Sequence, residues 1–299
     1  MGARPRALTL YSTPNWTSFH VGSSWADVVY GNNSHKGKKS KQPCLQVEDQ
    51  NGRRVTDGGG CWSGLICPGA DLYLEYHVTG LYYRGGSWEV ERNGGSEKFD
   101  AVILTMPVPQ ILQLQGDLGN CKTLTNNQKQ NQSEQREQLE GVRYSSRFAI
   151  ALFFSPGVVF SFTWGARYVT DSHCIRYIAV DNKKRSTGLG PSLVVHTSVP
   201  FGQENLEIEK DAIQPIILQE LHRLLPDLPQ PISIKSQKWR YSQVLTSVPN
   251  CPGHMTILEQ PLLICGGDAF THSNFDGCVE SALSVLRAFK VSLDIQKNT

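Results

Sequence analysis

An apolar run near the end of the chain, Pro261 to Cys265, leads into Gly266-Gly267-Asp268, and a helix-like segment follows from Asp276. Two adjacent glycines let the backbone approach a ligand closely, because neither carries a Cβ atom. A strand that passes through an acid to a helix N-terminus is typical of half a dinucleotide site. This feature constrains the fold most, since it predicts a buried strand with a helix packed against it.

A second apolar run, FDAVILTMP at 99–107, is hydrophobic at nearly every position. Such continuity is typical of a strand covered on both faces. Pro107 and Pro109 end this strand, and ILQLQ at 111–115 begins a helix. Earlier, residues 71–78 alternate as a strand, and Arg84-Gly85-Gly86 is predicted to turn a hairpin between 81–83 and 87–91.

The middle of the chain predicts a separate sheet. The polar stretch 119–138 is interpreted as a helix with an exposed face or as a flexible connection. Turn residues separate four strand-like runs, which favours an antiparallel sheet inserted between two parts of another domain; these runs are 145–154, 162–170, 174–180 and 192–199.

Three further elements complete the prediction. A helix is expected at 204–225, kinked or interrupted by Pro215, and a strand at 232–244. The last helix carries one apolar stripe, which predicts packing on a sheet, formed by Val279, Leu283, Leu286 and Phe289.

The composition, 39% hydrophobic and 19% charged over 299 residues, is that of a globular protein of one or two domains. A net charge of +2 gives no argument for nucleic acid, and the basic cluster 36–41 is interpreted as a solvated loop. The eight cysteines form no C-x-x-C pair and show no zinc-ligand spacing, so neither a metal site nor a disulfide framework is predicted.

The N-terminus has basic residues but lacks the apolar core of a cleavable signal peptide, which favours a cytoplasmic location. No run approaches the roughly 18 apolar residues of a membrane span. Sequons at Asn15, Asn32 and Asn131 matter only in an exported chain.

Several long phrases together resemble one known family: FDAVILTMPVPQILQLQGD, GVRYSSRFAIALFF, CIRYIAVDNKKR, GPSLVVHTSVPFG, LPDLPQPI and CGGDAFTHSNFDGCVESALSVL. From about Gly69 to about Phe289 the chain resembles the renalase family of FAD-dependent, amine-oxidase-like flavoproteins. The resemblance implies an α/β (α+β) fold with a partial Rossmann-like FAD/NAD(P)-binding domain and an inserted, mostly antiparallel substrate domain. It places the split cofactor domain at 69–118 and 245–299 and the substrate domain at 119–244, after an atypical, poorly ordered segment at 1–68.

The same resemblance assigns roles to particular residues. Asp268 would hydrogen-bond the ribityl and pyrophosphate region of FAD, and Gly266 and Gly267 would admit it closely. The other cofactor candidates are Val78, Thr105, Met106, Pro107, Phe270, Asn274, Phe275, Asp276 and Gly277. Trp239, Arg240 and Tyr241 are candidates for the catalytic wall, although ordinary strand packing is an equal interpretation. His196 and His272 are interpreted as satisfied polar residues.

Half of the expected cofactor site is missing from the sequence. Relatives begin with an apolar strand, G-x-G-x-x-G and a helix that cradles the pyrophosphate. The most similar segment in this sequence is Gly58 to Gly64, whose third glycine comes one residue later than in G-x-G-x-x-G. A polar segment precedes it, so it is interpreted as a loop. Without this unit we expect unpaired sheet edges, an apolar face without a partner, and weak or absent FAD binding.

Two hypotheses follow. The first is an FAD-dependent oxidase that passes a hydride from an isomeric dihydro-NAD(P) to flavin and on to O2, giving hydrogen peroxide; a catecholamine-like amine is the alternative substrate. The second is a non-catalytic remnant that acts through binding or signalling. By resemblance the partners are the dihydronicotinamide substrate and O2, without nucleic acid, and secretion is the alternative location. The oligomeric state cannot be inferred.

Overall fold

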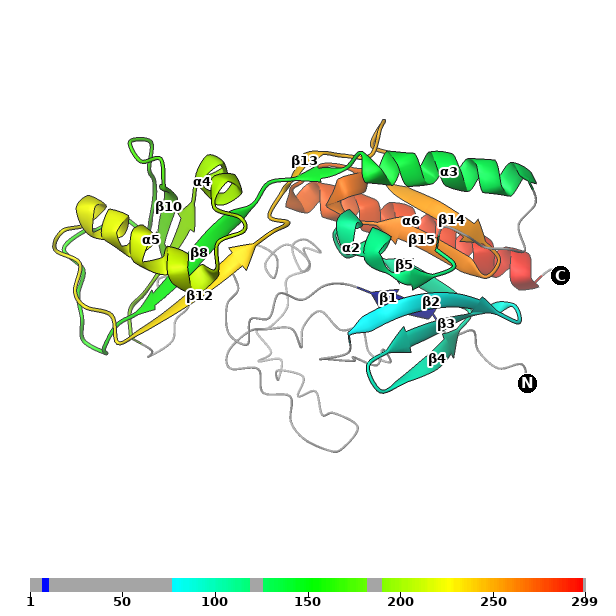
Figure 1. Ribbon diagram of the computed structural model, residues 1–299, viewed down its shortest axis with the longest axis horizontal. Coiled ribbons are helices and arrows are strands. Elements are labelled where there is room, and N and C mark those ends of the chain that lie inside the picture. Colours follow the sequence, from blue (N-terminus) through cyan, green and yellow to red (C-terminus); the bar gives the residue numbers. More distant parts are fainter. Residues whose placement is uncertain (1–6, 11–76, 119–125, 182–189, 298–299) are drawn as a thin grey trace, which may run out of the picture.

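The computed structural model describes residues 7–10, 77–118, 126–181 and 190–297. Figure 1 shows two parts, a five-stranded sheet with α4 and α5 at one end and a group of sheets with α3 and α6 at the other, connected through β7 and β13. The glycine loop 58–64, the basic cluster 36–41 and all but the last two residues of the strand expected at 71–78 lie outside the described residues.

A four-stranded sheet in the order β1-β5-β15-β14 contains both apolar runs of the sequence. β1 (Ala7–Leu10) and β15 (Leu262–Gly266) run parallel to β5 (Ala101–Leu104), while β14 (His254–Glu259) is antiparallel to β15. β5 is therefore flanked on both sides, and the unpaired edge that the sequence led us to expect beside it is filled by β1.

Both faces of this sheet are covered, as the continuous apolar runs predicted. Leu262 and Ile264 lie in a small cluster with Val285 of α6 (Phe275–Lys297), whereas Leu263 and Cys265 lie in the large core on the other face. That core includes residues of α2 (Val108–Gln113) and α3 (Asn126–Glu140). Side-chain alternation along β15 thus divides its residues between two helical layers.

The predicted hairpin is confirmed. β2 (Val78–Arg84) and β3 (Ser87–Arg92) pair antiparallel through a turn in which Gly85 and Gly86 both have positive φ, a region that glycine enters without steric cost. β4 (Gly95–Phe99) and the short β6 (Gln115–Gly116) complete this sheet in the order β4-β3-β2-β6. The indole of Trp88 is 1% exposed and donates to the carbonyl of Pro261, which ties the hairpin to the start of β15.

The antiparallel sheet is confirmed as well, with its strands in the order β12-β8-β11-β10-β9. Its members are β8 (Arg147–Phe153), β9 (Ala166–Tyr168), β10 (Ile175–Val180), β11 (Ser192–Thr197) and β12 (Ser233–Trp239). One face packs on α5 (Lys210–Leu224), whose Ile213, Ile217 and Leu221 are buried. The residues that form this core come from one continuous stretch of the chain.

Two expectations at the end of this region were wrong in detail. The segment 204–225 is interrupted at 205–209, between α4 (Val199–Glu204) and α5, while Pro215 lies inside α5. The interruption falls after Glu204, where the short helix α4 that Ser198 caps at its start comes to an end. The run 232–244 is also divided, because β12 ends at Trp239 and Val244 begins β13 (Val244–Thr246), which pairs with β7 (Arg143–Tyr144).

The packing face predicted for the last helix was wrong for three of its four residues, while Phe289 packs against the cluster that contains Val285. Val279, Leu283 and Leu286 are 40%, 53% and 45% exposed, and the face toward the sheet carries Ser281 and Val285 instead. The helix approaches β15 so closely that a Cβ atom on Gly266 would lie 2.7 Å from the Val285 side chain. Close approach selects small side chains on the contacting face, so the larger ones point outward.

Candidate functional site

The Gly266-Gly267-Asp268 sequence lies at the carboxyl end of β15, where the chain turns into a short 3-10 helix, η2 (Asp268–Phe270). Gly267 has φ +123°, which disfavours any residue with a Cβ atom. The Asp268 carboxylate accepts a hydrogen bond from the Ser273 hydroxyl at 2.9 Å. Burial raises the pKa of this carboxyl, and its hydrogen bonds from Ser273 and from the amides of Ala269 and Asp268 partly offset that effect.

Thr105, Met106 and Pro107 follow β5 and lie beside this turn. A Cβ atom on Gly267 would lie 3.6 Å from the Thr105 carbonyl oxygen, so the two strand ends are neighbours. Met106 packs against the large core, and Pro107 occupies the cap position that precedes α2. The structure therefore brings the Thr105–Pro107 and Gly266–Asp268 candidates together at one edge, which we call the strand-end edge.

Backbone amides around the strand-end edge are used by the protein itself. The amide of Thr105 donates to the Leu10 carbonyl at 2.8 Å, and that of Val108 donates to the Tyr144 hydroxyl at 3.2 Å. The amide of Gly267 donates to the Ser281 hydroxyl at 2.8 Å, and Ser281 in turn donates to the Gly253 carbonyl at 2.7 Å. Tyr144 and Ser281 were not among the candidates from the sequence.

The start of α6 is also satisfied internally. Asn274 accepts from the Gly277 amide at 2.7 Å through its side-chain oxygen, as a helix cap does. Gly277 is buried so tightly that a Cβ atom there would lie 2.1 Å from the His272 carbonyl oxygen. Phe275 is half-buried at the first position of the helix, while Asp276 is exposed in its first turn.

Two cofactor candidates lie away from the strand-end edge. Val78 begins β2 in the hairpin sheet and is half-buried against the large core. The Phe270 side chain is 0% exposed and belongs to the same core, so its position is explained by packing.

The three catalytic candidates have different surroundings. Trp239 ends β12 opposite Arg147, and Arg240 is exposed and forms two hydrogen bonds to Glu207, at 3.0 and 3.1 Å. Tyr241 packs edge-on against Tyr144 with ring centroids 5.4 Å apart. Burial raises the pKa of Tyr144 to about 12, with a further contribution from the nearby Asp268 carboxylate. Tyr241 is thus linked through Tyr144 to the strand-end edge, whereas Arg240 is occupied by its ion pair.

One face of the five-stranded sheet carries a polar and aromatic row that the sequence analysis missed. Strand register places Ala149, His196, Tyr177 and Tyr168 opposite one another in turn. The signal was present in the alternation of β8, β10 and β11, because these residues alternate with the ones that face α5. We call this face, together with the neighbouring Trp239 and Arg147, the polar sheet face.

Arg147 on the polar sheet face has an unusual environment. Its guanidinium donates to the Gln243 side chain at 2.8 Å, and its Nε is buried with no hydrogen-bond partner among the described residues. Burial lowers the pKa of Arg147, and the nearby Arg176 lowers it further. Two cations near each other favour an anionic ligand, which would relieve their repulsion.

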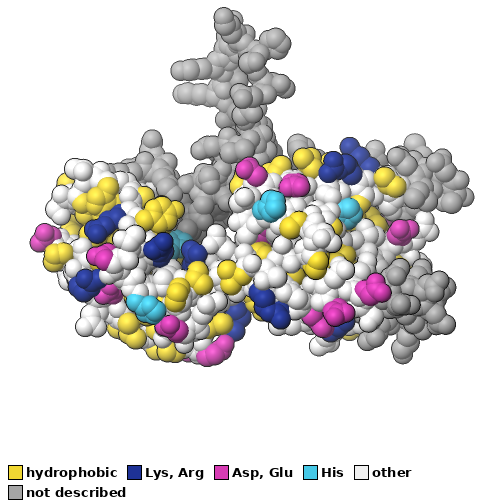
Figure 2. All heavy atoms as spheres, turned by 90° about the horizontal axis from the view of Figure 1, so that it is seen from above, with side chains coloured by type: hydrophobic (Ala, Val, Ile, Leu, Met, Phe, Trp, Pro, Cys, Tyr) yellow, Lys and Arg dark blue, Asp and Glu magenta, His cyan; other side chains and the backbone are white. Residues whose placement is uncertain are grey.

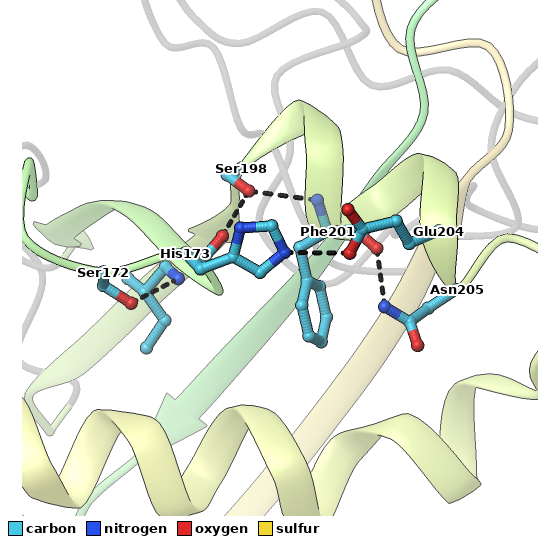
Figure 3. Close-up of polar contacts among 7 residues, drawn as sticks. Ser172, His173, Ser198, Phe201, Glu204 and Asn205 are labelled. Carbon is cyan, nitrogen blue, oxygen red and sulfur yellow. Dashed lines mark hydrogen bonds and ion pairs between the residues drawn. The ribbon is translucent and has the colours of Figure 1, made fainter.

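A serine, histidine and glutamate cluster near α4 does not form a hydrolytic triad (Figure 3). His173 contacts Glu204 at 2.8 Å, while the Ser198 hydroxyl donates to the backbone carbonyl of His173 and accepts from the Phe201 amide. Ser172 accepts from the Ile175 amide. No serine hydroxyl in this cluster is hydrogen-bonded to the His173 ring, so the cluster caps α4 and anchors the loop before β10.

Other site types find little support in the described part of the chain. No group of three or more His, Cys, Asp or Glu residues there could hold a metal ion. None of the helices described is both long and apolar enough to cross a membrane. Figure 2 shows basic and acidic side chains interspersed over the visible face, with no broad region of one sign. A cavity of about 20 Å³ between α2, α3 and β15 has room for a single water molecule.

Comparisons with known proteins identify relatives of this chain. Mouse (Mus musculus) renalase is 47% identical over 226 residues, which cover 74% of this chain and 64% of the renalase. The chain therefore spans less than two thirds of that relative's length. A crystal structure from Exiguobacterium sp. 255-15, assigned as a protoporphyrinogen oxidase, matches with a TM-score of 0.53 at 16% identity, over 73% of this chain and 47% of that one.

A wild-type putrescine oxidase bound to putrescine also matches, with a TM-score of 0.50 and 15% identity, over 77% of this chain and 50% of that one. At such low identities these two structures support the fold alone, a mixed α/β architecture. The model of one family, flavin containing amine oxidoreductase, matches residues 23–285. Because that match covers most of the sequence, the chain belongs to the flavin-containing amine oxidoreductases, a family whose cofactor is FAD.

Proposed function

We propose that this chain is a renalase-like, FAD-dependent oxidoreductase that oxidises isomeric forms of dihydro-NAD(P) with O2, yielding NAD(P)+ and hydrogen peroxide. Membership of the flavin-containing amine oxidoreductases and the likeness to mouse renalase support the oxidoreductase class. When bound, FAD supplies the hydride acceptor and the route by which electrons reach O2. The protein supplies binding, orientation and electrostatics.

The described residues fit the flavin half of the cofactor. At the strand-end edge, Asp268 offers a half-buried carboxylate acceptor for ribityl hydroxyls, and Gly267 leaves space for close approach. The backbone that would border the cofactor on the other side is Thr105–Pro107. For the adenosine diphosphate half, the described residues offer no glycine cradle.

The choice of substrate rests on one observation, the pair of cations at the polar sheet face. Arg176 lies close enough to Arg147 to lower its pKa, and Arg147 Nε is buried with no hydrogen-bond partner among the described residues. A dinucleotide brings phosphate groups that can accept from such a donor. A protonated catecholamine would add a third positive charge, so this arrangement favours the dinucleotide.

The remaining candidates receive narrower roles. Trp239 lies beside Arg147 on the polar sheet face and would contribute a wall against the substrate ring, and Tyr241 would contribute a second wall near the strand-end edge. Arg240 would act as a positioning residue, because its ion pair with Glu207 fixes the chain between these two side chains.

The test begins with the visible spectrum of the purified full chain after reconstitution with FAD. A yellow protein with stoichiometric flavin supports the proposal, whereas a colourless one overturns it. Turnover with isomeric dihydro-NAD(P) and with a catecholamine then separates the substrates.

We expect Arg147→Gln to raise KM for the dinucleotide by about tenfold, corresponding to one charge-assisted hydrogen bond. Arg167→Gln is the matched control, because Arg167 lies opposite Ile178 and hence on the other face of the sheet.

A non-catalytic binding or signalling role is the second candidate, and one observation favours it. The amides at the strand-end edge already donate within the protein, which leaves few donors for a cofactor. A protein that stays colourless with FAD yet folds cooperatively would select this alternative.

A further inference from the structure

The strand-end edge differs from a phosphate site in its supply of donors. Phosphates in dinucleotide sites are held by unpaired backbone amides at a helix N-terminus and in a glycine-rich turn. Here the amides of Thr105, Val108, Gly267 and Gly277 donate to a carbonyl, a tyrosine, a serine and an asparagine of the protein itself. The amides of Phe270 and Thr271 donate to Gly267 and Asp268 carbonyls. A phosphate would have to break these bonds to gain new ones.

The charge at this edge is also wrong for a phosphate. Burial raises the pKa of Asp268, while the Ser273 hydroxyl and two backbone amides lower it. A second acid, Asp276, lies in the first turn of α6, where it offsets the partial positive charge of the helix N-terminus. An anion approaching the edge would therefore meet the two carboxylates of Asp268 and Asp276.

The third strand gives no substitute. β1 ends at Leu10, and the Leu10 carbonyl is an acceptor for both the amide and the hydroxyl of Thr105. The four residues that follow in the sequence, Tyr11-Ser12-Thr13-Pro14, contain no glycine.

The strand-end edge offers hydrogen-bond acceptors. The Asp268 carboxylate and the Thr105 carbonyl oxygen lie beside Gly267, where the absence of a Cβ atom leaves the backbone open to close approach. Such a site suits a ligand that donates several hydrogen bonds and has no charge. We propose that the strand-end edge binds a flavin with an unphosphorylated ribityl chain, riboflavin, in preference to FMN and FAD.

This inference rests on the proposed function, because it assumes that a flavin binds at this edge. The test titrates the purified full chain with riboflavin, FMN and FAD by equilibrium dialysis at low ionic strength. We expect riboflavin to bind about three- to tenfold more tightly than FMN, the effect of one or two partly screened charges, and FAD to bind no more tightly than FMN. Added salt should narrow the difference between riboflavin and FMN.

Asp268→Asn tests the cause. This variant should reduce the ratio of the FMN Kd to the riboflavin Kd by at least half. Glu259→Gln should leave that ratio unchanged, since Glu259 is exposed and lies opposite Leu262 at the other end of β15. FAD binding more than about tenfold tighter than riboflavin would overturn the inference and leave the proposed function intact. A preference for riboflavin that neither salt nor Asp268→Asn changes would also overturn it. Failure of all three flavins to bind would overturn both.

Discussion

The five-stranded antiparallel sheet and the four-stranded sheet that contains β5 and β15 differ in how their cores are assembled. The first draws its core from residues between Phe148 and Ile234, one uninterrupted stretch, and covers it with α4 and α5. The second combines strands from 7–10, 101–104 and 254–266, and its helix α6 leaves four large apolar side chains exposed. The comparison teaches that one core forms within a single stretch of the chain, whereas the other depends on segments that lie far apart in the sequence.

The largest expected effect would come from the complete core. Leu193 on β11 is 0% exposed, so Leu193→Ala should lower the free energy of unfolding by about 2–5 kcal/mol, through lost burial and the cavity left behind. Leu283→Ala removes the same atoms from a side chain of α6 that is 53% exposed. It should change the free energy of unfolding by less than about 0.5 kcal/mol. Urea unfolding measures both. Equal losses would show that the stripe of α6 is covered in solution, and the contrast between the two regions would disappear.

A smaller effect is expected where α6 begins. Gly277→Ala would place a Cβ atom 2.1 Å from the His272 carbonyl oxygen, so the helix must move away from the strand-end edge. We expect a loss of about 1–3 kcal/mol from this overpacking. Gly165→Ala in the antiparallel region has open space within 4 Å and serves as control. If thermal unfolding shows similar Tm values for the two variants, the tight contact at Gly277 is not maintained.

The two regions should also respond to pH in opposite directions. Arg223 and Ser172 lower the pKa of Glu220 to about 2, so its contribution to stability is present above about pH 4.5 and is lost as the pH falls toward 2. Burial raises the pKa of Asp268 above 3.8, so its contribution is present below pH 3.8 and is lost as the pH rises through its folded-state pKa.

Hydrogen exchange followed by region between pH 3 and 6 can separate these contributions, since each amide reports its own part of the fold. Glu220→Gln should flatten the pH dependence of β10 and α5, and Asp268→Asn that of β15 and α6. A common pH profile throughout the chain would mean that the regions unfold as one unit.

The smallest effect is expected at Arg240. Its pair with Glu207 is solvent-exposed on both sides, with 44% and 80% of the side chains accessible, so Arg240→Gln should leave the urea midpoint unchanged within error. It should also leave flavin affinity unchanged, because Arg240 is exposed and paired with Glu207. A marked loss of flavin affinity would move Arg240 into the cofactor site and connect the two regions directly.

Local sequence signals predicted the elements well wherever one mechanism dominates. The paired glycines after Arg84 located the β2–β3 turn, and the continuous apolar runs located β5 and β15 with both faces covered. The interruption between α4 and α5 was placed at Pro215 instead, although a proline early in a helix removes only one hydrogen bond, near its first turn.

Features that depend on distant partners could not be inferred from the sequence. Apolar spacing in α6 indicated a stripe, but only the close approach of Gly266 decides that Ser281 and Val285 face the sheet. The Gly266–Asp268 turn and the Thr105–Pro107 segment were predicted as neighbours through resemblance. These segments are supported by single hydrogen bonds from or to Tyr144, Ser273 and Ser281. Such isolated hydrogen bonds leave no periodic pattern in the sequence.

The pairing of β1 with β5 has a consequence for how such chains diversify. Four residues, Ala7 to Leu10, satisfy the open side of β5 through backbone hydrogen bonds and a modest alternation of burial. A strand that is held mainly by backbone hydrogen bonds requires an extended backbone more than particular side chains. We therefore expect that other extended segments can complete the sheet at this position.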